Sequence, residues 1–162
     1  MNDLINYENM RQVVVKGLKD FLQCPVIRQN QTKEPPAYPY LSYTITTLAS
    51  QNNGTYGVYK DGTQAKPVKQ IWSISAFSDN DSESVMLITK ARNWLDNIGT
   101  TYLSDFEVIV EAVGGITNRD NLLTIGYEYR KGFDVTFWLL DIVDNVNAET
   151  IESYGFSIEQ GG

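Results

Sequence analysis

Alternation of apolar and polar residues is clearest between Tyr127 and Leu140. Within this stretch Phe133, Val135, Phe137 and Leu139 fall on one side of an extended backbone, and mostly polar residues fall on the other. A period of two residues is that of a strand with one side in the core. The rest of the chain is expected to be organised around this strand.

Charged residues precede the apolar run, because Glu128, Arg130 and Lys131 lie within four positions and are followed by Gly132. The glycine would allow a bend or a bulge at this point. The simplest interpretation is a core strand with a solvated, charged entry. No catalytic role follows from this pattern.

The spacing of apolar residues predicts a first helix from about Tyr7 to Leu22. Asn6 is the expected N-cap, because its side chain can accept from the first free backbone N–H groups. Gly17 indicates close packing against another element, since glycine costs about 1 kcal/mol relative to alanine inside a helix. The pair Cys24-Pro25 ends the segment.

A second helix is predicted between Asp79 and Gly99. The acidic residues Asp79, Asp81 and Glu83 suit the positive end of a helix dipole, and Gly99 suits the helix end. The apolar face of this helix is predicted to consist of Met86, Leu87, Ala91, Trp94, Leu95 and Ile98.

Other runs rich in aromatic and β-branched residues predict further strands. The run that begins at Tyr40 has Leu41, Tyr43, Ile45 and Thr47 on its one predicted buried face. Turn-forming residues between the later runs favour antiparallel neighbours. The expected fold is therefore α+β, with a mainly antiparallel β-sheet and two helices packed on one face. The predicted strands are 26–27, 40–48, 70–77, 106–113 and 122–129, in addition to 127–140.

Two long connections are predicted. Residues 29–39 are polar and carry three prolines, which is typical of a partly extended loop. Residues 49–67 contain the turn signals Asn53-Gly54 and Asp61-Gly62. Connections beyond ~12 to 15 residues are usually functional or mobile, so this inter-strand segment is either a projecting loop or a surface excursion.

The C-terminal part of the chain is acidic, since no basic residue follows Lys131. Near the end, Tyr154, Phe156 and Ile158 alternate with small residues. This pattern is typical of an arm that adds a strand to a neighbour's sheet, or of a frayed tail. The acidic residues after Lys131 are Asp134, Asp141, Asp144, Glu149, Glu152 and Glu159.

A chain of 162 residues with a formal net charge of -7 has the size of one domain. Nucleic acids and anionic membrane surfaces reward clustered Lys and Arg, so tight binding to either is not expected. No apolar run approaches the ~18 residues needed to cross a bilayer, and the N-terminus lacks a basic start. We expect a soluble protein without a signal peptide, with one domain over residues 1–144 and an acidic arm over residues 145–162.

The chain contains no histidine, which removes the usual hydrolase triads, histidine metal sites and the commonest general base near neutral pH. Cys24 is the only cysteine and has no partner to activate it, so a small buried residue is the expected role. No phosphate-cradling or dinucleotide-binding glycine motif occurs. We therefore expect no cofactor and no metal.

Carboxylates are the remaining candidates for chemistry. The run from Asp79 to Glu83 resembles the start of a calcium-binding loop, but Ser84 replaces the turn glycine and Lys90 replaces the bidentate glutamate. Helix capping explains this run better. Glu107 and Glu111 fall on the polar side of a predicted strand, where exposure to solvent is the ordinary explanation.

Two aromatic motifs carry a resemblance to a known family. They read Tyr-Pro-Tyr-Leu-Ser-Tyr at 38–43 and Tyr-Glu-Tyr-Arg-Lys-Gly-Phe-Asp-Val at 127–135. With the order helix, strand, long loop, strand, helix and terminal strands, the chain resembles the tail terminator, or neck and tail-completion, proteins of long-tailed bacteriophages. Many of these proteins have a late strand with a pattern like Glu-Arg-Arg-x-Gly-Phe-Asp. In this chain Tyr129 stands in place of the first Arg of that pattern. The resemblance spans roughly residues 5 to 143 and leaves the C-terminal arm outside.

The resemblance implies a structural virion protein without enzymatic activity. It would assemble in the bacterial host cytoplasm and form a hexameric ring on the tail tube, at the virion neck. Such a ring stops tube growth and presents a surface to the head connector or a head-completion protein, while DNA passes through without tight binding. Acidic or neutral walls suit that passage. The candidates for a loop that faces the lumen or the tube are Asn52, Asn53, Tyr56, Tyr59, Lys60 and Asp61.

The resemblance also suggests a role between subunits for the charged strand entry. Glu128, Arg130 and Lys131 would meet a neighbouring subunit across the ring, where carboxylates of its acidic C-terminal part can pair with the cations. The candidates from the arm itself are Tyr154, Phe156 and Ile158.

Two alternatives stay open from the sequence. One is another head-tail joining or tail tube protein of the phage. The other is a small enzyme that lacks histidine and uses two carboxylates in a cleft, for which the candidates are Asp79, Asp81, Glu107 and Glu111.

Overall fold

The computed structural model describes residues 2–29, 33–50, 57–58, 64–123 and 126–143. The helical elements are α1 (Asn2–Leu22), α2 (Asp81–Asn93), a π-helix (Trp94–Ile98) and α3 (Thr100–Asp105). The strands are β1 (Val26–Arg28), β2 (Tyr40–Ser50), β3 (Gly57–Val58), β4 (Gln64–Ser78), β5 (Ile109–Val113), β6 (Thr117–Asn118), β7 (Asn121–Leu123) and β8 (Gly126–Val143).

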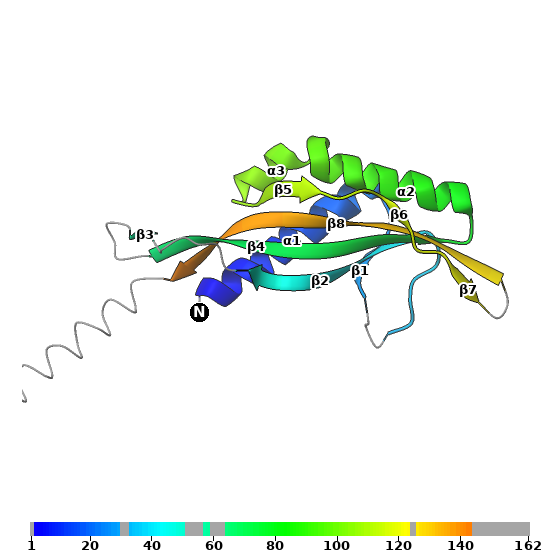
Figure 1. The fold of residues 1–162 in the computed structure, drawn as a ribbon, viewed down its shortest axis with the longest axis horizontal. Helices are drawn as coiled ribbons and strands as arrows, with labels where there is room; N and C mark the ends of the chain where they lie inside the picture. Colours follow the sequence, from blue (N-terminus) through cyan, green and yellow to red (C-terminus); the bar gives the residue numbers. More distant parts are fainter. Residues whose placement is uncertain (1, 30–32, 51–56, 59–63, 124–125, 144–162) are drawn as a thin grey trace, which may run out of the picture.

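Two long antiparallel strands, β4 and β8, form the centre of the sheet and run along the length of the molecule (Figure 1). The main strand order is β1-β2-β4-β8-β5, with β3 beside β4 and with β6 and β7 beside β8. Only the β1–β2 pair is parallel among the described strands. The predicted α+β class with a mainly antiparallel sheet is confirmed.

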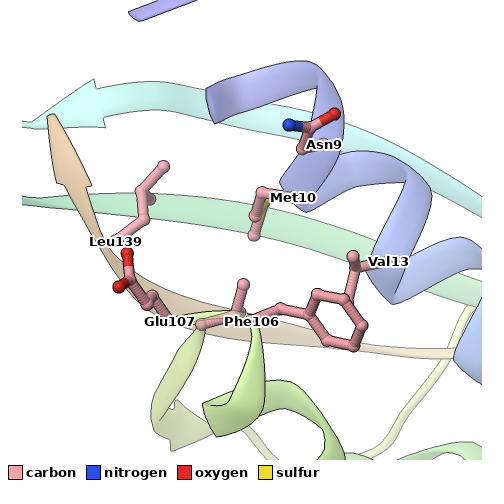
Figure 2. A pocket seen from close by; sticks show the side chains of 7 residues that line it. Asn9, Met10, Val13, Phe106, Glu107 and Leu139 are labelled. Carbon is pink, nitrogen blue, oxygen red and sulfur yellow. The ribbon is translucent and has the colours of Figure 1, made fainter. Parts of the chain in front are cut away.

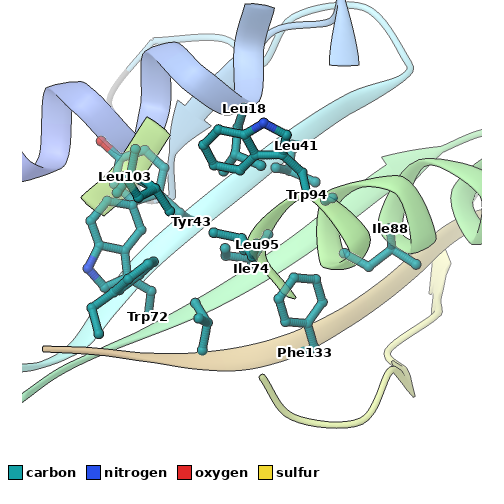
Figure 3. Packing of buried hydrophobic residues seen from close by; sticks show 14 of the residues in the cluster. Leu18, Leu41, Tyr43, Trp72, Ile74, Ile88, Trp94, Leu95, Leu103 and Phe133 are labelled. Atoms are coloured by element: carbon teal, nitrogen blue, oxygen red, sulfur yellow. The ribbon is translucent and has the colours of Figure 1, made fainter. Parts of the chain in front are cut away.

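The core lies between the helices and one face of the sheet (Figure 3). Trp72 of β4 stacks on Tyr43 with ring centroids 4.8 Å apart and meets the edge of Phe137 at 5.4 Å. The buried Trp72 indole donates to Oε1 of Gln70 at 2.7 Å, so its polar N–H group is paired. On β8 the alternation predicted from the sequence is confirmed, since Phe133, Val135, Phe137 and Leu139 are all buried.

Helix α1 packs closely against the end of the second helical segment. A Cβ added to Gly17 would lie 2.5 Å from the ring of Trp94, so only glycine permits this approach. The prediction of close packing at Gly17 is confirmed. The predicted N-cap at Asn6 is wrong, because the helix already begins at Asn2. The acidic Asp3 suits a helix start there, where the dipole is positive.

The second helical segment differs from its prediction in its cap and its outer residues. Asn80 caps α2 by accepting from the backbone N–H of Glu83. Met86 is exposed because it lies about 200° around the helix from the buried Ser84 and Ile88. After Asn93 the chain continues as a π-helix that ends at Gly99 and leaves the predicted core residue Ile98 exposed. Helix α3 was not predicted.

Two predicted strands have different limits or faces. The first four residues of β2 are buried on both faces, and its far end is exposed, so a single buried face over 40–48 is wrong. The predicted strand 106–113 begins only at Ile109, and Phe106 and Ala112 are exposed. A bulge between Val110 and Ala112 shifts the register and turns Val113 toward the core.

The predicted loop 49–67 is shorter than expected. Strand β2 continues to Ser50, β4 begins at Gln64, and the short strand β3 pairs with β4 between them. The loop candidates Asn52, Asn53, Tyr56, Tyr59, Lys60 and Asp61 lie outside the described residues.

Gly132 has a role other than the predicted bend or bulge. The register between β4 and β8 is continuous through the Ser75–Gly132 pair. A Cβ at Gly132 would lie 2.4 Å from Nη1 of Arg119 and 2.7 Å from the backbone oxygen of Ile74. The glycine therefore provides the space in which the Arg119 side chain crosses the sheet.

We expect Gly132→Ala to lower the free energy of unfolding by about 1–3 kcal/mol, because the oxygen of Ile74 belongs to the central strand pair and cannot move freely. Urea denaturation of the variant and the parent protein measures the loss. Gly115→Ala is the matched control, since a Cβ there meets no described atom within 4 Å. Equal losses in the two variants would contradict this role of Gly132.

Candidate subunit interface

A row of stacked side chains crosses the sheet on the side opposite the main core. Tyr40 of β2, Phe77 of β4 and Arg130 of β8 are direct cross-strand neighbours. The rings of Tyr40 and Phe77 stack at 4.9 Å with an interplanar angle of 7°, and the Arg130 guanidinium lies 4.9 Å from the Phe77 ring. Cation–π contact and stacking hold the planar guanidinium against the sheet.

The segment before β2 extends this row. Tyr38 stacks on Tyr40 at 5.8 Å, and its hydroxyl donates to Oε2 of Glu128 at 2.6 Å. The hydrogen bond to Glu128 and burial raise the pKa of Tyr38 to about 12. Burial raises the pKa of Tyr40 as well. Both phenols therefore stay protonated near neutral pH, and Tyr38 keeps the proton that it donates to Glu128.

Lys131 points to the opposite side of β8 and is buried, with 7% of its surface exposed. Its ammonium Nζ lies 2.6 Å from Oδ1 of Asp120 and 2.9 Å from Oδ1 of Asp81. The same Asp120 oxygen accepts from the backbone N–H of Arg130 at 2.7 Å. Lys131 thus connects β8 to the start of α2 and to the turn between β6 and β7. The prediction that Lys131 lies in a solvated strand entry is wrong.

The charges of this cluster stabilise one another. Burial acts to lower the pKa of Lys131, but its bonds to Asp120 and Asp81 outweigh burial and raise the pKa above its ordinary value. Burial acts to raise the pKa of Asp120, yet Lys131 and the Arg130 N–H group hold it below the usual range. Both groups are therefore charged across the physiological pH range.

Arg119 is fixed beside the row on the same side of the sheet. Its Nη1 donates to the hydroxyls of Ser73 and Ser75 at 2.8 and 3.0 Å, across the space above Gly132. Its Nη2 lies 3.4 Å from Oδ1 of Asp134. The hydroxyls of Ser73 and Ser75 thus hold Arg119 against the sheet, while its partner Asp134 is exposed.

The other end of the molecule carries two adjoining hollows, of which Figure 2 shows the first. The first has a volume of about 140 Å³ and lies between α1 and the turn that follows α3. Glu107 and Leu139 line both hollows, and Glu107 has a left-handed backbone with φ of 62°. Glu111, nearby on β5, forms an ion pair with Lys69 at 2.8 Å. Lys69 lowers the pKa of Glu111.

The carboxylates considered for an enzyme do not meet in one cleft. Asp79 and Asp81 lie at the start of α2, near Arg130, whereas Glu107 and Glu111 lie near Trp138. Eight residues of β8 separate these ends, or about 26 Å along the strand. No group of three potential metal-ligating side chains occurs within the described residues. Cys24 is partly buried, which raises the pKa of its thiol.

Sequence reasoning found Glu128, Arg130 and Lys131 but missed their partners. Tyr38, Tyr40 and Phe77 were assigned to a loop or to strands, and nothing in their spacing shows that they stack. The turn that holds Asp120 was recognised, but its pairing with Lys131 depends on how β6 and β7 fold back on β8. The arm residues Tyr154, Phe156 and Ile158 lie outside the described residues.

The sequence matches the model of one known protein family. The family model of the phage neck terminator proteins matches residues 12–162. The chain belongs to the phage neck terminator family. The resemblance seen in the sequence is confirmed, and a neck terminator is a structural component of the virion neck that associates with other tail or head proteins.

The family match also corrects the expected extent. The match continues to residue 162. The expectation that the C-terminal segment lies outside the family is therefore wrong. A comparison with curated proteins found none that matches this terminator. In the described part of the chain, no helix is both long and apolar enough to cross a membrane.

We expect Lys131→Met to lower the free energy of unfolding at pH 7 by about 2 kcal/mol, because Asp120 loses its cation while remaining largely buried. The pKa of Asp120 is lowered in the folded state. The stabilisation is therefore complete above the unfolded pKa of about 3.9 and is lost as the pH falls through the folded pKa. Urea denaturation at several pH values measures the difference between parent and variant.

The difference should persist at neutral pH and shrink below about pH 3. Lys90→Met is the control, since Lys90 is exposed on α2 and forms no ion pair among the described residues. A difference between parent and Lys131→Met that stays constant down to about pH 2 would contradict the pairing with Asp120.

Proposed function

We propose that six copies of this terminator form a ring that caps the phage tail tube, ends tube growth and forms the joint to the head connector. Family membership carries the proposal, since the neck is where tail and head components meet. The rigid row at one end of the sheet supports it, because an interface between copies needs side chains held in place before they meet.

Charge supports the passage of DNA through such a ring. The formal net charge of the chain is -7, so phosphates that slide through the lumen are repelled or left unbound instead of being held. Residues 52–61, with their candidates Asn52, Asn53, Tyr56, Tyr59, Lys60 and Asp61, stay proposed as the part that faces the lumen or the tube.

The subunit contacts are proposed to involve Glu128 and Arg130 directly. Lys131 contributes by position, because its ammonium is bound to two carboxylates of its own chain and orders the strand that carries Arg130. Arg130 is half-buried, and its guanidinium forms no ion pair among the described residues. A carboxylate from a neighbouring copy could pair with the accessible part of this guanidinium, and the acidic C-terminal part of the chain provides such groups.

Capping of tail tubes is the direct test of the proposed function. Purified protein mixed with isolated tail tubes should form a ring on one end of each tube, seen by electron microscopy. Phage that lack the gene should make tails of uncontrolled length, because nothing ends tube growth. Tails of normal length in that deletion would show that this protein does not terminate the tube.

Arg130→Gln tests the contact between copies. We expect the variant to fold like the parent by circular dichroism and to need about tenfold more protein to form rings, since it loses the charge that a neighbour pairs with. Sedimentation velocity over a range of concentrations measures assembly. Arg130→Lys separates the two properties of the side chain, because it keeps the charge and loses the planar stack on Phe77.

Lys90→Gln is the matched control for the loss of one exposed cation, and it should assemble like the parent protein. Charge reversal at Lys131 is unsuitable as a test, since a third carboxylate beside Asp120 and Asp81 would disrupt the monomer. Rings that form from Arg130→Gln at the parent concentration would remove Arg130 from the proposed interface.

A further inference from the structure

A hollow of about 180 Å³ lies where the segment before β2 covers the sheet, next to the stacked row. This volume is below the range of pockets for whole small-molecule ligands and suits a single side chain. Tyr40 and Phe77, two members of the row, form part of its wall. The other lining residues are Ile27, Arg28, Gln29, Lys33, Pro35 and Ser42.

The hollow has an unsatisfied polar group in its wall. Ser42 is 2% exposed, and its hydroxyl has no hydrogen-bond partner among the described residues. A buried hydroxyl without a partner costs free energy. A side chain that enters the hollow and bonds to Ser42 would therefore supply the hydrogen bond that this hydroxyl lacks in the free subunit. The remaining wall is largely apolar, which favours an aromatic ring with a polar tip.

One exposed cation, Lys33, lines the hollow and forms no ion pair within the described residues. Arg28 also borders the hollow, but it pairs in register with the core residue Tyr43 and acts on the pKa of Glu8 on α1, so its guanidinium lies on the helix side of the sheet. The charge of the site therefore favours an occupant that carries a carboxylate beside its aromatic ring.

The C-terminal segment of the same sequence has these properties. Residues 144–162 contain four carboxylates and no Lys or Arg, and they include Glu152 and Tyr154. Residues two apart lie on the same side of an extended chain. A segment bound in extended form would therefore present the Tyr154 ring to the hollow and the Glu152 carboxylate to Lys33.

The segment reaches the hollow of its own subunit only when it is almost fully extended. Ser42 of the hollow pairs with Ser75, which pairs with Gly132, so Val143 lies eleven residues, or about 36 Å, from the hollow along β8. Tyr154 follows Val143 by eleven residues, which span at most about 40 Å when stretched and about 18 Å as a flexible chain, so a neighbouring copy is the favoured donor. The two places are at opposite ends of the sheet, since β2 and β8 both point away from the row (Figure 1).

We propose that the hollow lined by Lys33 and Ser42 binds the C-terminal segment of a neighbouring copy, with Tyr154 inside it and Glu152 paired to Lys33. The inference rests on the proposed ring, whose copies it places head to tail. It names the receiving site on one subunit and the inserted residue of the next. The family match extends through this segment, so the segment is part of the shared sequence.

A peptide of residues 145–162, labelled at its N-terminus, tests the site directly. Fluorescence anisotropy with the full-length protein, at concentrations below its self-association, should show saturable binding that weakens with added salt. Lys33→Glu should weaken binding about tenfold, because the cation becomes repulsive to Glu152. Lys90→Glu, the same reversal of one exposed cation on α2 that does not line the hollow, should bind like the parent.

The hydroxyl contact has its own test. A Tyr154→Phe peptide should bind the parent protein about fivefold more weakly than the parent peptide, the loss of one neutral hydrogen bond. Against Ser42→Ala protein the two peptides should bind equally, because the partner hydroxyl is gone. The same fivefold difference against Ser42→Ala would overturn the placement of Tyr154 in this hollow.

Failure of this site is distinguishable from failure of the ring. No binding of the peptide, or equal binding to the Lys33→Glu protein, overturns the inference, whether or not the full-length protein caps tubes. Peptide binding that is specific for the hollow, with no ring on tail tubes, supports the site and rejects the proposed capping. Binding of a scrambled peptide with the same affinity would show a general attraction for acidic chains and would also overturn it.

Discussion

The uninterrupted pairing of β4 with β8 is the constraint on which the structure depends. It runs from the Gln64–Val143 pair to the Ser78–Tyr129 pair without a register shift. Because successive side chains of a strand alternate between faces, a slip by one residue would exchange the core face with the polar face. The same register that buries Phe133 against the helices therefore also sets Arg130 opposite Phe77 on the other side.

Burial of Lys131 shows how polar groups fix the end of this strand pair. A buried ion pair adds little net stability compared with apolar packing, yet loss of one partner leaves an uncompensated charge. Lys131 joins β8, the start of α2 and the β6–β7 turn through two carboxylates. Alternative arrangements of these three elements would leave Asp120 or Lys131 unpaired. The cluster thus selects one arrangement of the end that carries Arg130, as the proposed contact with a second copy would need.

The local sequence pattern predicted most of the helices and strands, but it did not predict the contacts between distant segments. The two-residue period of β8 identified Phe133 and Val135 as core residues, whereas the interface role of Glu128 and Arg130 came from the family resemblance and stays a prediction. Burial of Lys131 could not be predicted, because its partners lie 50 and 11 residues away in the sequence. The double burial of β2 has the same origin, since the segment with Tyr38 folds back over Tyr40. The exposure of Ala112 reflects a bulge that the alternation does not encode.

The long β4–β8 strand pair also places the two ends of the subunit far apart. An isologous contact would bring the same patch of two copies together and would stop at a dimer, whereas a head-to-tail contact uses two different patches and closes into a ring if the rotation allows. This chain has the proposed receiving site at one end, where the exposed Lys33 lies beside a Ser42 hydroxyl with no partner among the described residues, and its strand β8 leaves toward the opposite end. A contact between two unlike ends, about 36 Å apart along one strand pair, is of the kind from which a ring of identical subunits can close.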